Sequence, residues 1–400
     1  MKILSHFPAD SPSVASPEVE LLLCCARTTL DPGIAERMRT LLQANLNWKF
    51  LVEIAFCHGV TPLLFWHLKA AAPEAVPTAC WLQLQTYFHT NARRNLFLTG
   101  ELLPLLKFFE AHNIPAIAFK GPLLALSVYG NLALRQFGDL DILVRAGDVC
   151  QAKELLVAQG YQLRNQRGWE SSFLHTQTGV IVDLHQGLTP WYFPFALDFE
   201  RLWARRSPLS LLGRLIPNLL PEDLLLILCV QGTKDCWDRR EKLAQVCDVA
   251  ELIRRQPLDW QRVLEQASHS GSQQMLLRGL GLAHKLLGVV LPTAVLQKVH
   301  SSVIEALVTQ GYELLFSQAK VPATGSERRC FYFSVRERLQ DRAAYFLYCA
   351  ITPSQQDLAM LSLPQFLYFL YYLLRPLRLI GVYAQRPSRT YQRLKQLLRF

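Results

Sequence analysis

Between residues 101 and 188 the chain alternates short apolar runs with segments of helical pattern, and this alternation limits the fold more than any other feature. The helical patterns cover residues 101–113, 121–130 and 146–160, and the strand-like runs cover 114–120, 139–144, 161–165 and a hairpin in 173–188. Interleaved strands and helices predict an α/β or α+β core of roughly 95 residues. Because helical patterns flank this core on both sides, the predicted fold class is α+β, a small mixed sheet embedded in a mainly helical protein.

The pattern divides the chain into four predicted regions. Residues 1–95 form an N-terminal helical region and 96–190 the α/β core. Residues 191–320 form a helical domain, in which 221–234, 241–255 and 272–290 are the best helix candidates. Residues 321–400 form a basic, aromatic C-terminal helical region.

Two acidic residues stand side by side at the start of the apolar run GDLDILV. Side chains alternate along a strand, so Asp139 and Asp141 project from the same face. Two neighbouring carboxylates repel unless a cation neutralises them, and Mg²⁺ or Mn²⁺ prefers such oxygen ligands. Asp183, in the later apolar run VIVDLHQGL, is a third candidate ligand, and His185 lies two residues on. Alone, an Asp-x-Asp pair is more often a solvated strand end or a helix cap.

A turn between a strand and a helix supplies a second element of the same candidate site. The sequence FKGP places Lys120 and Gly121 at the end of an apolar run, directly before a helix with Pro122 in its first turn. Free N–H groups at such a turn, together with a lysine, favour a phosphate group.

The ordered set of motifs resembles the polymerase-beta-like nucleotidyltransferase superfamily, and within it the family of uncharacterised nucleotidyltransferases. The matching segments are AFKGPLLALSVYGNLALRQFGDLDILV, VDLHQGL and QGTKDCWDRREKLAQVCDVAELIRR, and the resemblance covers roughly residues 20–290. One departure is the turn, where the superfamily usually has Gly-Ser or Gly-Gly and this chain has Lys120-Gly121-Pro122. Pro122 lacks an N–H donor, and Lys120 is expected to compensate as a charge on the triphosphate.

The resemblance implies catalytic and metal-binding roles for Asp139, Asp141 and Asp183, with Mg²⁺ or Mn²⁺ as cofactor. It implies nucleotide-binding roles for the residues Lys120, Gly121, Arg135, His185 and Lys234. For some of these residues a structural role is equally open: an ion pair for Arg135, and packing for His185. Trp237 is a candidate for stacking on a base, although a helix–helix contact is the better interpretation. Asp248 is either a buried anchor or a substrate contact.

The implied activity is transfer of an NMP group from a nucleoside triphosphate to an unidentified hydroxyl acceptor in a small molecule, sugar or protein. The alternative is a catalytically degenerate nucleotide-binding or scaffold protein of the same fold, a hypothesis that the altered turn leaves open. A metal-dependent hydrolase is a third hypothesis. It is disfavoured because binuclear hydrolases usually need more histidine ligands than this segment offers.

Composition bears on partners and location. The net charge of +10 favours acidic partners such as nucleotides, nucleic acid or anionic lipid. No pair among the ten cysteines has CxxC spacing, and the N-terminus lacks the apolar run of a signal peptide. We therefore expect reduced thiols and a cytoplasmic protein, with peripheral membrane contact as an addition.

The C-terminal region has two features that bear on such contact. Residues 358–374 carry no charge, and their length is at the lower limit for a membrane-spanning helix. Ser362, Pro364 and Gln365 interrupt this stretch and favour a buried or interfacial helix instead. Residues 375–400 contain seven Lys or Arg and no acidic residue, with Tyr383 and Tyr391 among them. RNA or an anionic membrane would suit this tail, and a solvated end is the alternative.

Overall fold

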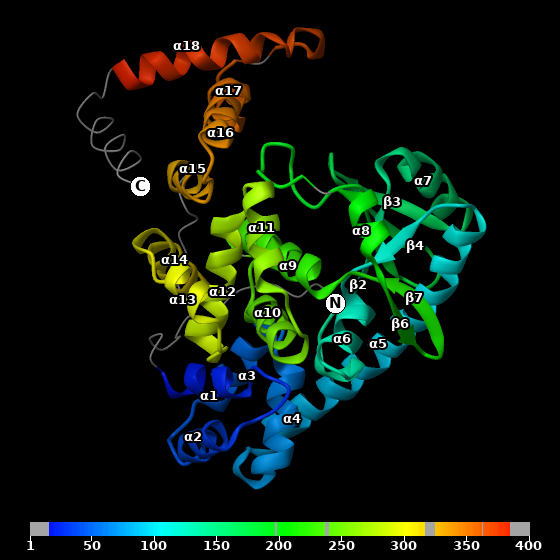
Figure 1. Cartoon of the computed structure of the whole chain (residues 1–400), viewed down its shortest axis with the longest axis vertical. Coiled ribbons are helices and arrows are strands. Elements are labelled where there is room, and N and C mark those ends of the chain that lie inside the picture. The colour runs from blue at the N-terminus through cyan, green and yellow to red at the C-terminus, as the bar shows by residue number, and fades with distance from the viewer. Residues whose placement is uncertain (1–15, 197, 237–239, 317–324, 362, 385–400) are drawn as a thin grey trace.

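A five-stranded mixed sheet forms the centre of the α/β part of the molecule (Figure 1). The computed structural model describes residues 16–196, 198–236, 240–316, 325–361 and 363–384. The strands are β1 (Ala116–Ala118), β2 (Asp139–Val144), β3 (Tyr161–Gln166), β4 (Glu170–His175) and β5 (Ile181–His185), in the spatial order β1-β2-β5-β4-β3. Strands β2 and β5 are parallel, and the other neighbouring pairs are antiparallel. The α+β class and each of the strand-like runs predicted from the sequence are confirmed.

Three helices connect and support the strands: α5 (Thr78–Ala111), α6 (Gly121–Ser127) and α7 (Val149–Ala158). Leu102 and Phe109 of α5, Ile142 of β2 and Leu156 of α7 belong to one buried apolar cluster. Helix α5 continues without a break past residue 95, where the sequence pattern suggested a boundary. The sheet therefore rests on a helix that extends into the N-terminal helical part.

A small antiparallel hairpin, β6 (Ser207–Leu211) and β7 (Arg214–Asn218), follows α8 (Phe199–Arg205). Leu211 and Ile216 of this hairpin are buried in the same cluster as the five-stranded sheet. The sequence pattern predicted only helices after Trp191, and this prediction is wrong for residues 207–218. The turn is Leu212-Gly213, with positive φ at both residues, and a leucine in that conformation is uncommon.

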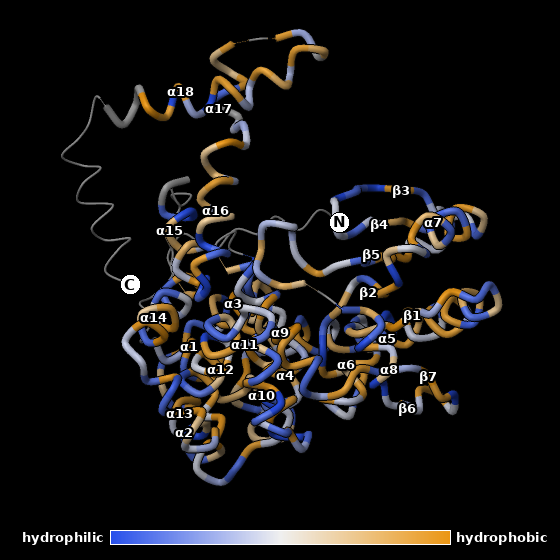
Figure 2. The backbone as a smooth tube through the Cα atoms, turned by 45° about the horizontal axis from the view of Figure 1, so that its top comes forward, coloured by the Kyte–Doolittle hydropathy of each residue, from blue (hydrophilic) through white to orange (hydrophobic). Residues whose placement is uncertain are grey.

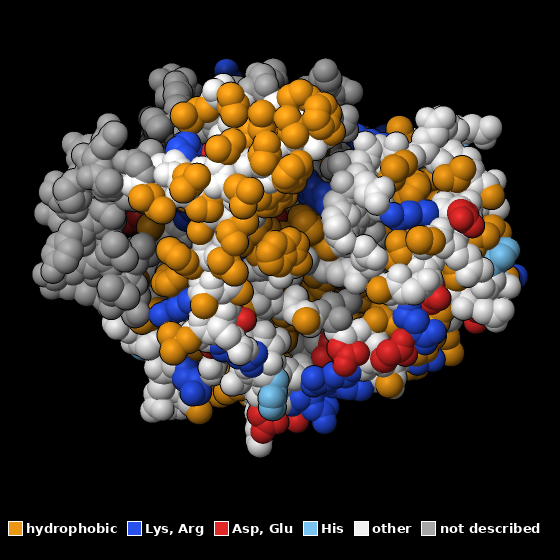
Figure 3. Space-filling model, turned by 90° about the horizontal axis from the view of Figure 1, so that it is seen from above, with side chains coloured by type: hydrophobic (Ala, Val, Ile, Leu, Met, Phe, Trp, Pro, Cys, Tyr) orange, Lys and Arg blue, Asp and Glu red, His pale blue; other side chains and the backbone are white. Residues whose placement is uncertain are grey.

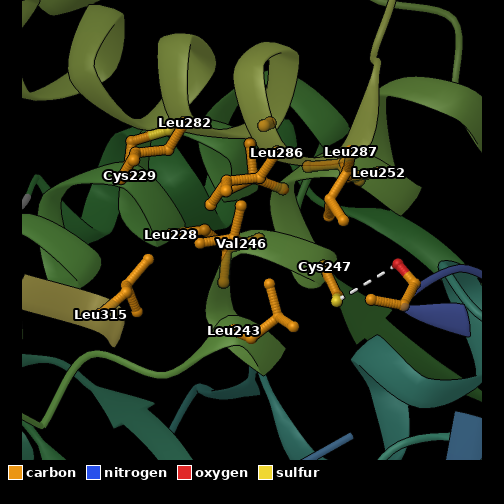
Figure 4. Close-up of a cluster of buried hydrophobic side chains, with 14 of the residues drawn as sticks. Leu228, Cys229, Leu243, Val246, Cys247, Leu252, Leu282, Leu286, Leu287 and Leu315 are labelled. Atoms are coloured by element: carbon orange, nitrogen blue, oxygen red, sulfur yellow. Dashed lines mark hydrogen bonds between the residues drawn. The ribbon is translucent and has the colours of Figure 1, made fainter. Parts of the chain in front are cut away.

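The helices on either side of the core in the sequence pack together in space (Figure 1). The N-terminal ones are α1 (Pro17–Cys25), α2 (Pro32–Leu42), α3 (Trp48–Cys57) and α4 (Thr61–Ala71), and the later ones are α9 (Pro221–Cys236), α10 (Leu243–Arg255), α11 (Trp260–Ser270), α12 (Gln273–Leu287), α13 (Thr293–Val299) and α14 (Ser302–Phe316). Figure 4 shows Leu228 of α9, Val246 of α10 and Leu286 of α12 meeting in this second apolar cluster. The three helices predicted in residues 221–290 are confirmed as α9, α10 and α12.

The C-terminal helices extend away from this body as an arm (Figure 1). They are α15 (Gly325–Ser334), α16 (Leu339–Ile351), α17 (Gln355–Met360) and α18 (Leu370–Ala384). Hydrophobic residues recur along α16 and between α17 and α18 (Figure 2). Residues 358–374 do not form the single helix expected from the sequence, because α17 ends at Met360 and α18 begins at Leu370. Among the described residues, no helix has both the length and the apolar composition that crossing a bilayer requires.

Candidate active site

The parallel pairing of β2 and β5 brings the three predicted acidic residues to one face of the sheet. Asp141 and Asp183 are direct neighbours across the two strands, and Asp139 precedes Asp141 by two residues. The residues between them, such as Leu140 and Val182, point to the opposite face and are buried in the apolar cluster. Because side chains alternate along each strand, one face of the sheet is apolar and the other carries the acidic residues, as the sequence predicted.

The acidic residues differ in their protonation behaviour. Burial raises the pKa of Asp139 to about 6, with further repulsion from Asp141 and Asp183. Burial also raises the pKa of Asp183, although a hydrogen bond from Ser172 opposes the shift. For Asp141 burial is outweighed by the charge of Lys120 and a hydrogen bond with His185, so its pKa is lowered. Lys120 thus lies close enough to the acidic residues to affect their charge.

His185 is hydrogen-bonded to an acidic residue on the neighbouring strand. Its Nε2 lies 3.0 Å from Oδ1 of Asp141, its Nδ1 lies 4.0 Å from a Glu170 carboxylate oxygen, and its ring packs edge-on against Phe119. Because His185 aligns with Leu143 in the parallel register, it reaches diagonally to Asp141 and not to Asp183 on its own strand. The ring therefore orients a candidate catalytic carboxylate.

The turn between β1 and α6 approaches the acidic strand closely. Gly121 has a φ of +54°, and a Cβ added there would lie 3.4 Å from the main-chain oxygen of Asp139. Pro122 has no N–H, and the N–H of Leu123 already donates to the Lys120 carbonyl. The backbone therefore offers few donors to a phosphate, and the Lys120 side chain, which lines the same cleft as the acidic residues, is the stronger candidate.

Arg135 forms a buried network that joins the residues before β2 to α10. Its guanidinium donates two hydrogen bonds to Asp248, at 2.8 and 2.9 Å, and the Tyr129 hydroxyl donates to the same carboxylate at 2.7 Å. Asp248 is 1% exposed. Arg135 lines the cleft, but its charge is already neutralised, and Asp248 acts as a buried anchor.

Lys234, on α9, is partly buried and donates a 3.3 Å hydrogen bond to the carbonyl of Leu188. Burial lowers its pKa, while the charge of Asp235 opposes this shift. Lys234 lines the cleft, which is the position that a nucleotide contact requires. Trp237, the candidate for stacking on a base, lies outside the described residues.

A single cleft of about 680 Å³ is lined by the three predicted acidic residues and by Lys120, Arg135, His185 and Lys234, whereas Gly121 does not line it. That volume suits a nucleotide-sized ligand. Its basic lining residues are Arg94, Lys120, Arg135, Arg167, Lys234, Arg240 and Lys242, and its acidic ones are Asp139, Asp141, Glu170, Asp183, Asp235 and Asp248. Such a mixture suits a ligand that carries phosphate groups together with cations.

Helix α5 contributes residues to the site that the sequence analysis did not identify. Asn91 and Asn95 donate side-chain hydrogen bonds to the carbonyls of residues 132, 133 and 135, and so position the segment that leads into β2. Arg94 donates to the carbonyl of Gly138, next to Asp139. Two asparagines four residues apart in a helical pattern were the available signal, because buried asparagines need hydrogen-bond partners.

The acidic residues have the ligand chemistry of a magnesium or manganese site but are not gathered around one point. Oδ1 of Asp183 is buried without a hydrogen-bond partner among the described residues, which is the state of an available ligand atom. Within the residues that the structure describes, no three His, Cys, Asp or Glu side chains lie close enough together to hold a metal ion. Carboxylates without a cation between them repel one another, and Asp141 is hydrogen-bonded to His185.

Comparisons with known proteins agree with the residue pattern. A search of curated proteins finds no match. A solved structure, described as an antigenic nucleotidyltransferase-like protein from Paracoccidioides brasiliensis, matches with 15% identity and a TM-score of 0.30, over 50% of this chain and 96% of that chain. The profile of a family described as uncharacterised nucleotidyltransferases matches residues 44–288, which include α5, the whole sheet and the cleft residues from Gly59 to Asp248. The chain therefore belongs to this family of nucleotidyltransferases.

Proposed function

We propose that the chain transfers an NMP group from a nucleoside triphosphate to a hydroxyl acceptor and that the reaction depends on Mg²⁺ or Mn²⁺. The observation that carries the proposal is the cross-strand pairing of Asp141 with Asp183, with Asp139 beside them and Lys120 in the same cleft. Family membership supports nucleotidyl transfer in general. The metal, the nucleotide and the acceptor belong to the proposal.

In this reaction the acceptor oxygen forms a bond to the α-phosphorus, and the bond from that phosphorus to the bridging oxygen breaks, which releases pyrophosphate. Asp183, whose pKa is raised by burial, is placed to accept the proton of the acceptor hydroxyl. Lys120 contacts the β- or γ-phosphate, and His185 keeps Asp141 ionised and oriented. Asp139, Asp141 and Asp183 would hold the cation, which supplies charge neutralisation at the reacting phosphate.

A nucleotide-binding protein without turnover is the second candidate function. The separation of the three carboxylates in the described structure favours it, as does the Lys120-Gly121-Pro122 turn with its missing donor. The two candidates differ in one property, because only the enzyme releases pyrophosphate.

The test is pyrophosphate release from each NTP in the presence of Mg²⁺ or Mn²⁺, with and without EDTA, using a lysate of the source cell as the acceptor mixture. Mass spectrometry identifies the acquired NMP. We expect release only with the cation, and a loss of about 100-fold or more in Asp139→Asn and Asp141→Asn. Glu154→Gln, which changes an exposed carboxylate on α7 outside the cleft, is the matched control and should retain activity.

The result separates the two functions. NTP binding without pyrophosphate release in any mixture would favour the non-catalytic protein. Equal release with and without EDTA would contradict the cation dependence. If Asp139→Asn or Asp141→Asn unfolds the protein, that residue has a structural role and its assignment to catalysis is wrong.

A further inference from the structure

The C-terminal arm exposes an unusually large apolar surface. Figure 3, which views the molecule from the side of the arm, shows hydrophobic side chains gathered over a broad area. Six residues between the end of α17 and the last turns of α18 define what we call the outer face: Phe366, Phe369, Tyr372, Leu373, Leu377 and Ile380, each at least 50% exposed. Contiguous apolar surfaces of this kind mark sites of interaction with proteins or membranes.

Helix α18 is amphipathic, but its apolar side faces outward and its charged side faces the protein. This is the reverse of an ordinary surface helix. Leu373, Leu377 and Ile380 follow helical spacing on its exposed side. Arg375 and Arg378 lie on the opposite side and face the protein, where both pair with Asp357 of α17. Arg375 also donates two hydrogen bonds to the carbonyl of Cys349 on α16. The fold therefore turns the charges of α18 toward the protein and leaves its apolar side outward.

The charges near the outer face indicate which partner would cover it. Asp357 is the last acidic residue of the chain, and two arginines already neutralise it. Residues 385–400, which lie outside the described structure, contain five Lys or Arg and no Asp or Glu. An apolar surface that is followed in the sequence by a purely basic segment complements a partner that is apolar inside and negatively charged at its surface. An anionic lipid bilayer has this combination.

We propose that the outer face binds the surface of an anionic membrane, with its apolar side chains in the interfacial layer, and that the basic charge of the sequence 385–400 strengthens this binding by attraction to the lipid headgroups. The aromatic residues Phe366, Phe369 and Tyr372 are of the types enriched at that depth. Since no described helix is suited to crossing a bilayer, the arm lies on the surface. The proposal is independent of the proposed catalytic function.

The outer face is separate from the cleft. No residue of the outer face lines it. The base of the arm is nevertheless attached beside the cleft, because the Tyr332 hydroxyl of α15 donates to the main-chain carbonyl of Lys234 at 2.9 Å. Arg336, which follows α15, donates to the carbonyl of Tyr192. The base of the arm is therefore joined to residues beside the cleft, although the outer face is not part of the cleft.

The test is co-sedimentation of the full chain with vesicles of phosphatidylcholine alone or mixed with phosphatidylserine, at low and high salt. We expect binding to the mixed vesicles that weakens with salt and little binding to the neutral ones. The double variant Leu373→Ser/Leu377→Ser should bind at least about tenfold more weakly. Leu82→Ser/Leu96→Ser on α5 removes two leucines that are 54% and 55% exposed, and this matched control should bind like the parent.

A second variant tests the charges without altering the described fold. Arg386→Gln/Arg389→Gln/Arg393→Gln should weaken binding by about fivefold for each residue changed. Absence of binding, equal binding to neutral and anionic vesicles, or equal losses in the two leucine variants would overturn the proposal. So would a dimer in vesicle-free sedimentation that Leu373→Ser/Leu377→Ser abolishes, since the outer face would then bind a second copy.

Discussion

The sheet and the C-terminal arm distribute charged and apolar side chains in opposite ways. In the sheet, residues such as Ile142 and Val182 are fully buried, and the acidic residues of the same strands face a cleft. In the arm, Asp357 and Arg375 are buried, and leucines and aromatic residues face outward. The difference shows that exposed apolar residues indicate an interaction surface when charged residues are buried beneath them. Folding alone would favour the reverse arrangement.

The buried ion pairs of the two regions provide the test with the largest expected effect. Asp248→Ala should lower the free energy of unfolding by about 3–5 kcal/mol, because it leaves Arg135 buried without its partner. Asp357→Ala should loosen α17 and α18 without shifting the main unfolding transition, because no described residue of these two helices belongs to either buried apolar cluster. Chemical denaturation measures both effects.

The control for this comparison is an exposed pair. Arg37 and Glu20 are about half exposed, so Glu20→Ala should cost less than about 1 kcal/mol. If Asp357→Ala shifts the main transition as much as Asp248→Ala, the arm is not energetically separate from the body and the comparison fails.

The two regions should also differ in how they recognise phosphate, because Lys120 has a defined position in the cleft, whereas the sequence that follows the arm supplies several basic residues. Charge-assisted bonds to phosphate contribute about 1.5–3 kcal/mol, so Lys120→Ala should weaken NTP binding roughly tenfold to a hundredfold. Binding of the NMP should change much less, since it lacks the contacted groups. Calorimetry with both ligands measures this difference.

Lys107→Ala, at an exposed position of α5 outside the cleft, is the control and should leave both affinities unchanged. An equal loss for NTP and NMP in Lys120→Ala would place the lysine near the α-phosphate or the nucleoside. Loss of vesicle binding in the same variant would contradict the separation of cleft and arm.

The smallest expected effect concerns pH. The folded protein raises the pKa of Asp139 to about 6, so the ion-free fold loses stability as the pH rises from about 4 through 6. A cation that replaces the proton should stabilise the fold most above pH 6, and its apparent affinity should fall about tenfold per pH unit below that. The rise in Tm caused by Mn²⁺, measured between pH 5 and pH 8, tests this dependence.

The arm should be insensitive over the same range. Burial opposes ionisation of Asp357, but hydrogen bonds from Ser354 and Arg375 outweigh it and lower its pKa to about 2. Vesicle binding should therefore be constant between pH 5 and pH 8. Asp139→Asn should remove the pH dependence of the Mn²⁺ effect, and persistence of that dependence in the variant would assign it to another group.

The sequence predicted the strands and the three acidic residues because both depend on local pattern. Alternation along a strand places Asp139 and Asp141 on one face wherever that strand is located in the fold. The hairpin at residues 207–218 was missed for a local reason as well. Pro208 and Pro217 are unfavourable in strands, and Leu212 is not a residue expected at positive φ.

The partners of the other candidate residues depend on tertiary contacts, which no local pattern contains. Arg135 meets Asp248 more than a hundred residues later in the sequence, and His185 reaches Asp141 through the register of a parallel pair. Neither contact follows from spacing along the chain. The same limit applies to Lys234, whose bond to the Leu188 carbonyl joins α9 to the segment that follows β5.

The strand order has a consequence for folding kinetics. Strands β3, β4 and β5 are consecutive and antiparallel, so they can form from short-range contacts, whereas β2 pairs with β5 only by closing the long segment between them. We therefore expect Asp141 and Asp183 to come together late in folding, in a step that brings like charges to neighbouring positions on the two strands. Substitutions that remove one of these charges should therefore accelerate the pairing of β2 with β5, so we expect the candidate site residues to slow the formation of the sheet that carries them.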